Sequence, residues 1–153
     1  MSTDDDLSPA EALRELLETL ADAFALDAAI EIEEQDGILR GSVTGTGADA
    51  LVGERGAVID AIQHLAQRVV LRGEEELRLV VDAAGYRGRR EAELRTEADR
   101  AADAAVGEGR EVALAPMPAA ERRFVHEHLR DRGDVGTHSE GDEPRRRLIV
   151  APL

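Results

Sequence analysis

Residues 51–65 read Leu-Val-Gly-Glu-Arg-Gly-Ala-Val-Ile-Asp-Ala-Ile-Gln-His-Leu, a short loop that leads directly into an apolar stripe at helical spacing. In this loop Gly53 and Gly56 enclose Glu54 and Arg55, and glycine permits close approach of the backbone to a ligand. Exposed amides at the start of the following helix would favour an anion such as a phosphate. Two glycines three residues apart are a weak signal by themselves, because a simple turn explains most such pairs. The elements on either side of the loop therefore decide its interpretation.

The residues before this loop predict a helix followed by a β-hairpin. Residues 8–11, Ser-Pro-Ala-Glu, have the form of a capping box with proline at the first helical position. Leucines at helical spacing then predict a helix over residues 9–25. Isoleucines alternate with acids around residues 30–32, and the Asp-Gly pair at 36–37 favours a tight turn into a strand over 38–44.

After the loop, apolar spacing predicts helical structure that begins at Ala57 and ends before Gly73, followed by a strand over 77–81. The order α-β-β-α-α-β results for this first part. A second part follows a junction near residues 82–85, with the predicted order α-β-α-β-β and Phe124 on the apolar side of its second helix. The fold class is therefore α+β, with two small domains that each have a three-stranded sheet with helices packed on it. The predicted divisions are an acidic tail (1–8), a first domain (9–83) and a second domain (84–153).

A second motif lies in the second domain, where residues 121–126 read Glu-Arg-Arg-Phe-Val-His. Arg122 and His126 are four residues apart on a predicted helix and so project from one face. The run continues with Thr-His-Ser at 137–139 and Pro-Arg-Arg at 144–146. Together these residues resemble an R-three-H domain, a family that is named for its Arg-x-x-x-His and binds single-stranded nucleic acid.

The first domain resembles a KH domain of the bacterial type II topology, in which a Gly-x-x-Gly loop clamps the backbone of about four nucleotides. A type II KH domain joined to an R-three-H domain resembles the Jag family, the SpoIIIJ-associated proteins of bacteria. The resemblance covers about Pro9 to Leu153, and an acidic tail and helix stand where longer members carry a separate Jag domain. It implies RNA binding, a small KH-domain partner protein, and a role as a post-transcriptional regulator or RNA chaperone linked to cell elongation and division.

The residue types suggest how a strand would be bound, with single-stranded RNA or DNA as the ligand. Arg122 offers a planar fork to a phosphate or a base edge, and His126 can stack on a base or donate to a phosphate. Hydroxyl groups and further cations extend this site, and they belong to Thr137, Ser139, Arg145 and Arg146.

In the first domain the candidate contacts are Gly53, Glu54, Arg55 and Gly56. Glu54 departs from the family pattern, because KH loops usually carry a basic residue at that position and a carboxylate repels phosphate.

The formal net charge of −14 argues at first sight against a nucleic-acid ligand. Residues 1–36, however, hold twelve acidic side chains and one arginine, so most of the imbalance lies ahead of both motifs. All 19 basic residues of the chain are arginine. Without cysteine the chain has no disulfide or thiol nucleophile, and without lysine it has no standard phosphate-binding P-loop.

The sequence argues against several functions other than nucleic-acid binding. An enzyme is not expected, and neither a cofactor nor a small-molecule substrate is indicated. A metal site is not expected either, because His126 and His128 do not share a helical face. The sequence contains no apolar run long enough to span a membrane, and its acidic N-terminus is unlike a signal peptide, so a cytoplasmic protein is expected. The alternative that stays open is a protein-interaction module whose KH unit serves dimerisation rather than RNA binding.

Overall fold

The structure, a computed structural model, describes residues 7–153, so most of the predicted acidic tail lies outside the described residues. Contacts divide the chain into two compact units, one ending at Arg87 and one running from Gly88 to Leu153. The predicted α+β class with two three-stranded sheets is confirmed. Within residues 7–153 no helix is both long and apolar enough to cross a membrane.

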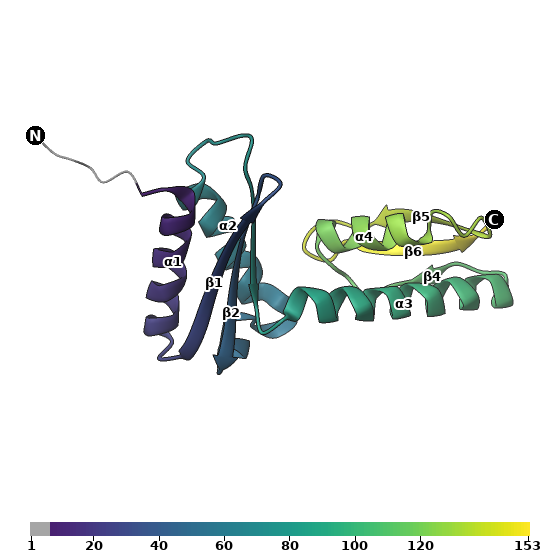
Figure 1. Cartoon of the computed structure of the whole chain (residues 1–153). Coiled ribbons are helices and arrows are strands. Elements are labelled where there is room, and N and C mark those ends of the chain that lie inside the picture. Colours follow the sequence, from purple (N-terminus) through teal and green to yellow (C-terminus); the bar gives the residue numbers. More distant parts are fainter. Residues whose placement is uncertain (1–6) are drawn as a thin grey trace, which may run out of the picture. The chain divides into compact units, whose positions relative to one another are not determined.

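The N-terminal unit has the order α-β-β-α-β and a single sheet with strand order β1-β2-β3 (Figure 1). Strands β1 and β2 form the predicted hairpin, and β3 pairs parallel to β2. Its elements are α1 (Pro9–Ala23), β1 (Asp27–Gln35), β2 (Ile38–Thr46), α2 (Ala57–Val70) and β3 (Arg78–Ala83). Between β2 and β3 the structure has two short 3-10 helices and one α-helix, where two α-helices were predicted. Helix α2 ends at Val70, near the predicted end, because Gly73 and three consecutive glutamates do not continue its apolar face.

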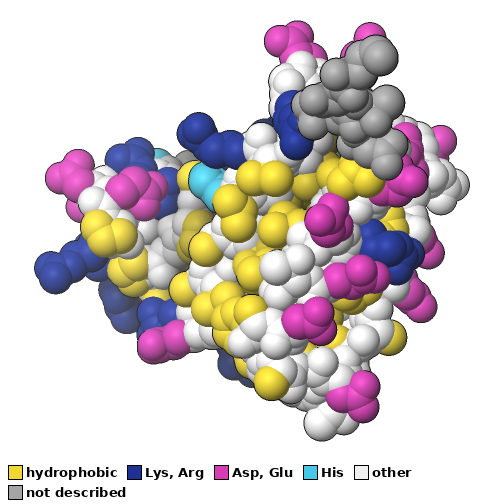
Figure 2. All heavy atoms as spheres, turned by 90° about the vertical axis from the view of Figure 1, so that its left-hand side faces the viewer, with side chains coloured by type: hydrophobic (Ala, Val, Ile, Leu, Met, Phe, Trp, Pro, Cys, Tyr) yellow, Lys and Arg dark blue, Asp and Glu magenta, His cyan; other side chains and the backbone are white. Residues whose placement is uncertain are grey.

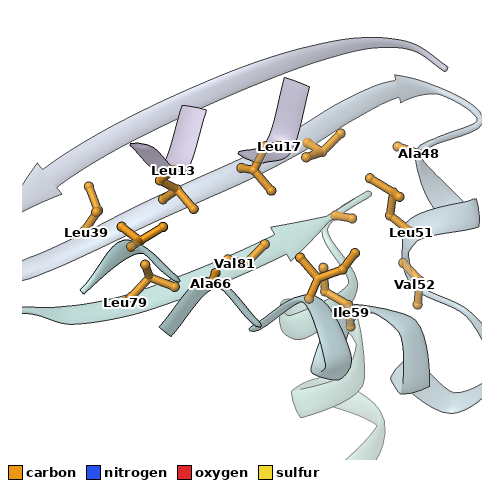
Figure 3. Close-up of a cluster of buried hydrophobic side chains, with 14 residues drawn as sticks. Leu13, Leu17, Leu39, Ala48, Leu51, Val52, Ile59, Ala66, Leu79 and Val81 are labelled. Carbon is orange, nitrogen blue, oxygen red and sulfur yellow. The ribbon is translucent and has the colours of Figure 1, made fainter. Parts of the chain in front are cut away.

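The core of the N-terminal unit lies between one face of the sheet and helices α1 and α2. Leu13 and Leu17 of α1 meet the inward-facing residues of the strands, and Ile59 and Ala66 of α2 join the same cluster (Figure 3). A Cβ at Gly41 would lie 2.7 Å from Leu17 Cδ1, so glycine lets α1 pack closely on β2. The predicted capping box of α1 is present, and its hydrogen bonds from Ser8 to the Glu11 carboxylate lower the pKa of Glu11.

Helix α3 (Tyr86–Glu108) begins in the N-terminal unit, where the Arg87 side chain anchors its first turn. Arg87 Nε donates to the Val81 carbonyl at 2.7 Å, and its Nη1 lies 3.6 Å from Asp60 Oδ1. The Gln63 side chain pairs with the backbone of Leu79 and Val81, so polar groups of α2 and α3 cover the edge of β3.

The C-terminal unit contains the rest of α3, β4 (Val112–Ala113), α4 (Ala119–Leu129), β5 (Val135–Glu140) and β6 (Arg147–Pro152). Its strands are antiparallel in the order β4-β6-β5. Helix α3 presents a face of small residues to the core, with Leu94 as its one large buried side chain. Phe124 is half-buried against the core, and the Arg95 guanidinium lies 5.1 Å from its ring centre.

Ion pairs join α3 to the rest of the C-terminal unit. Arg90 makes a two-bond contact with the carboxylate of Glu121 in α4, with both N···O distances 3.0 Å, and this contact raises the pKa of Arg90. Arg132 bonds both Asp134 and Asp103, and these bonds raise the pKa of Arg132. The bond from Arg132 also lowers the pKa of Asp134. Such paired charges hold α3 and α4 in a defined orientation.

Candidate nucleic-acid interface

The Gly-x-x-Gly loop forms the predicted connection into α2, and its two central residues, Glu54 and Arg55, are exposed. Gly53 has φ 73° and ψ −177°, a conformation that only glycine adopts readily, and Gly56 has φ 79°. Arg55 also lies in the left-handed region, at φ 53°. The loop is therefore sharply bent over its whole length.

The backbone amides that were expected to be free at the start of α2 are already bonded within the chain. The Ala57 N–H donates to the Glu54 carbonyl, and the Val58 and Ile59 N–H groups both donate to the Val52 carbonyl. The Gly56 N–H is directed at the Gly53 carbonyl, at 3.4 Å. The expectation of exposed amides was wrong because the bent loop folds its own carbonyls back over the helix end.

The two glycines are also packed against neighbouring side chains. A Cβ at Gly53 would lie 2.4 Å from Val58 Cγ2 and 2.9 Å from the Val58 backbone nitrogen. A Cβ at Gly56 would lie 2.6 Å from the Tyr86 hydroxyl and 2.7 Å from its ring. Both positions thus need glycine for the chain's own packing, whether or not a ligand approaches.

The predicted residues of the C-terminal unit gather around one open hollow with a volume of about 450 Å³. Helix α4, strand β5 and the start of β6 surround it. The predicted residues among its lining are Arg122, His126, Thr137, Ser139 and Arg146. Arg145, the remaining predicted contact, is exposed on the turn before β6 and does not line the hollow.

Arg122 is the one charged residue that is buried in the described part of the chain, with a side chain 9% exposed. Its Nη1 donates to the Met117 carbonyl at 2.7 Å and is 3.4 Å from the Arg146 carbonyl. Its Nη2 donates to Glu143 Oε1 at 2.6 Å. The guanidinium is therefore already engaged by the protein, although Arg122 also lines the hollow.

His126 is exposed, and its Nδ1 is hydrogen-bonded to Thr137 Oγ1 at 2.5 Å. This bond fixes the orientation of the ring and leaves Nε2 as the nitrogen that can bond a ligand. Thr137 therefore orients His126, whereas Ser139, two residues along the same strand, keeps a half-buried hydroxyl at the lining.

Two polar residues of the lining, Arg123 and His138, were not singled out from the sequence. Arg123 is exposed and bonds Glu127 at 2.9 Å, and His138 lies between the two predicted hydroxyl residues of β5. Their adjacency to Arg122, Thr137 and Ser139 was the available signal. Ala119 and Leu148 give the hollow its apolar part.

Helix α1 carries a group of exposed acidic side chains that do not line the hollow. Figure 2 views the protein from the side on which α1 lies in Figure 1, and it shows Asp and Glu side chains spread among hydrophobic ones. In α1 the exposed acids are Glu11, Glu15, Glu18 and Asp22. None of these residues lines the hollow, and the acids nearest to it, Glu127 and Glu143, are paired with Arg123 and Arg122.

Comparisons with known proteins show what this chain is similar to. The family model of the R-three-H domain matches residues 92–152, which include the whole lining of the hollow. The chain is 34% identical over 140 residues to a Clostridium symbiosum protein, and 38% identical over 102 residues to one from Lactiplantibacillus plantarum. A Bacillus subtilis protein is 29% identical over 148 residues. All three relatives carry the name RNA-binding protein KhpB.

The alignments cover 90%, 66% and 95% of this chain, in the same order. Of the relatives themselves they cover 63%, 32% and 71%. The chain thus spans less than two thirds of two of these proteins, which contain further sequence outside the region compared.

Proposed function

The chain belongs to the Jag family of proteins with an R-three-H domain, and from this membership we propose that it binds single-stranded RNA through its C-terminal unit. The observation that carries the proposal is the gathering of Arg122, His126, Thr137, Ser139 and Arg146 around one hollow. These residues are spread over 25 positions of the sequence and meet only because α4 packs against the β5–β6 hairpin. The names of the relatives support RNA as the ligand.

The residue types suggest a contact made by hydrogen bonds and charge rather than by stacking. His126 presents an oriented ring, Ser139 presents a hydroxyl, and Arg146 with the exposed Arg145 supplies cations for the phosphates. The chain has one tyrosine, two phenylalanines and no tryptophan, too few for a platform that stacks several bases. We therefore expect modest affinity with limited base preference.

The wider role follows from family membership and is part of the same proposal. It comprises post-transcriptional regulation or RNA chaperoning in the bacterial cytoplasm, a link to cell elongation and division, and association with a small KH-domain protein. A binding role rather than an enzymatic one belongs to the same proposal, and the relatives named RNA-binding protein support it.

Fluorescence anisotropy with short labelled RNA and DNA strands tests the proposal directly. We expect binding at 50 mM salt that weakens by about tenfold at 200 mM, because two to three phosphate contacts each release counterions. The measurement needs only the intact chain and two salt concentrations. Absence of RNA binding at 50 mM salt would contradict the proposed function.

A second candidate function concerns the N-terminal unit, which we propose contacts another protein rather than RNA. Two observations favour it: the amides at the start of α2 are bonded within the chain, and Glu54 places a carboxylate at the exposed tip of the loop. A free carboxylate repels phosphate, whereas it does not oppose a protein contact.

Changing Glu54 to lysine separates the two roles of this unit. If the loop does not touch RNA, Glu54→Lys should change RNA affinity no more than Glu75→Lys, which alters the charge equally on another exposed loop of the same unit. Titrations of both variants by anisotropy give the comparison. An affinity gain for Glu54→Lys several times larger than for Glu75→Lys would show that the loop contacts phosphate and would reject the second candidate.

A further inference from the structure

The Arg122 side chain joins segments that are distant in the sequence. Nη1 bonds the Met117 carbonyl in the linker between β4 and α4, and Nη2 bonds Glu143 in the turn between β5 and β6. The same turn is attached to the linker by a hydrogen bond from Met117 N–H to the Arg146 carbonyl at 3.2 Å. The guanidinium thus lies between the linker and the β5–β6 turn, beside the hollow.

Three of the five N–H groups of the Arg122 guanidinium already donate to protein oxygens, two from Nη1 and one from Nη2. A phosphate that bound both terminal nitrogens would therefore compete with these bonds. The 9% exposure of the side chain also means that a phosphate would have to replace Glu143 to reach Nη2. By contrast, Arg145 and His126 are exposed, and the half-buried Arg146 lines the hollow.

We propose that Arg122 is a positioning residue: it holds the linker and the β5–β6 turn together, and RNA is contacted by the side chains that this arrangement presents. The inference deepens the proposed function and rests on it. Two hydrogen bonds position Arg146. Arg122 Nη1 donates to the Arg146 carbonyl, and Arg146 Nη1 donates to the Gly141 carbonyl at 2.8 Å. Arg122 therefore affects RNA binding indirectly, through its bonds to the backbone carbonyls of Met117 and Arg146.

In the opposite arrangement, the Glu143 carboxylate occupies the position of an RNA phosphate. RNA would displace this carboxylate, and Arg122 would then bind the strand directly. The two arrangements differ in what the negative charge of Glu143 does. In the positioning arrangement only its oxygen is needed, because a neutral acceptor can take the same hydrogen bond. In the displacement arrangement the charge competes with RNA.

Glu143→Gln distinguishes them, with Glu140→Gln as a matched control. Glu140 lies in the same hairpin, pairs with Arg147 at 3.3 Å, and its side chain is 58% exposed, as is that of Glu143. We expect both variants to raise RNA affinity equally, within about twofold, by removing one negative charge near the strand. An affinity gain for Glu143→Gln at least fivefold above that of the control, with a salt slope steeper by about 0.7, would overturn the positioning role.

Nuclear magnetic resonance of the arginine side chains gives a second readout that requires no substitution. The Arg122 guanidinium signals should be protected from solvent exchange without RNA and should shift little when RNA is added, while the His126 ring signals shift. A large RNA-induced shift at Arg122 would overturn the inference.

Arg122→Lys keeps the charge but not the planar fork. This variant should lose RNA affinity about tenfold while the C-terminal unit stays folded, and unchanged affinity would also overturn the inference. Failure of the unaltered chain to bind RNA would instead overturn the proposed function.

Discussion

Replacing Arg122 and His126 together with alanine should weaken binding of single-stranded RNA by about 30-fold or more, roughly 2 kcal/mol. His126→Ala removes an oriented ring from the lining, and Arg122→Ala removes the bonds that hold the β5–β6 turn. Anisotropy at low salt measures the loss. The loss should exceed that caused by Gly53→Asp in the N-terminal loop, because the residues gathered at the hollow all belong to the C-terminal unit.

Loss of folding has to be separated from loss of contact, since Arg122 is buried. His126 is exposed, so His126→Ala alone should keep the melting temperature of the parent and still lose part of the affinity. Circular dichroism of each variant provides this control. If the double variant bound RNA as tightly as the parent, the hollow would not be the nucleic-acid interface.

Gly53→Ala should destabilise the N-terminal unit by roughly 4 kcal/mol, the sum of backbone strain and overpacking. The new Cβ would lie 2.4 Å from Val58 Cγ2 and 2.9 Å from the Val58 backbone nitrogen, so the start of α2 itself would have to move. A backbone with φ 73° and ψ −177° adds strain of about 1–3 kcal/mol for any residue other than glycine. Overpacking contributes a similar amount. Thermal or urea unfolding of the intact chain, followed by circular dichroism, measures the change.

Gly73→Ala is the matched control for this effect. Gly73 also has a positive φ, 91°, but a Cβ there would meet no atom within 4 Å, so that variant reports backbone strain alone. We expect Gly73→Ala to cost about 1–2 kcal/mol. Equal destabilisation by the two variants would refute the packing role of Gly53. Reduced RNA binding in a Gly53 variant cannot be assigned to a lost phosphate clamp unless stability is measured beside it.

Much of the candidate interface was predictable from local sequence, because the spacing of residues along a helix or strand determines which side their side chains face. A separation of four residues on α4 brings Arg122 and His126 to one side, and a separation of two on β5 brings Thr137 and Ser139 to one side. All four then line the same hollow. Arg123 and His138 also line it, and only their adjacency to the predicted residues could have indicated this.

The bonding state of the N-terminal loop was not predictable in the same way. The pattern Gly-x-x-Gly before a helix correctly indicated a sharp bend, but it does not specify which carbonyls the first amides meet. Those amides donate to the carbonyls of Val52 and Glu54 because the bend folds the preceding residues back over the helix end. Gly56 packs against Tyr86, which lies thirty residues later in the chain. No pattern in the residues around Gly56 indicates this contact.

The sequence by itself determined the two α+β units, most of their strands and helices, and five of the nine residues that line the hollow. It could do so because hydrophobic periodicity, capping residues and turn residues act over a few neighbouring positions. Only the tertiary structure decided what Arg122 does, since its partners Met117, Glu143 and Arg146 lie 5, 21 and 24 residues away. A buried guanidinium takes its role from the oxygens that surround it, and packing alone brings those oxygens together.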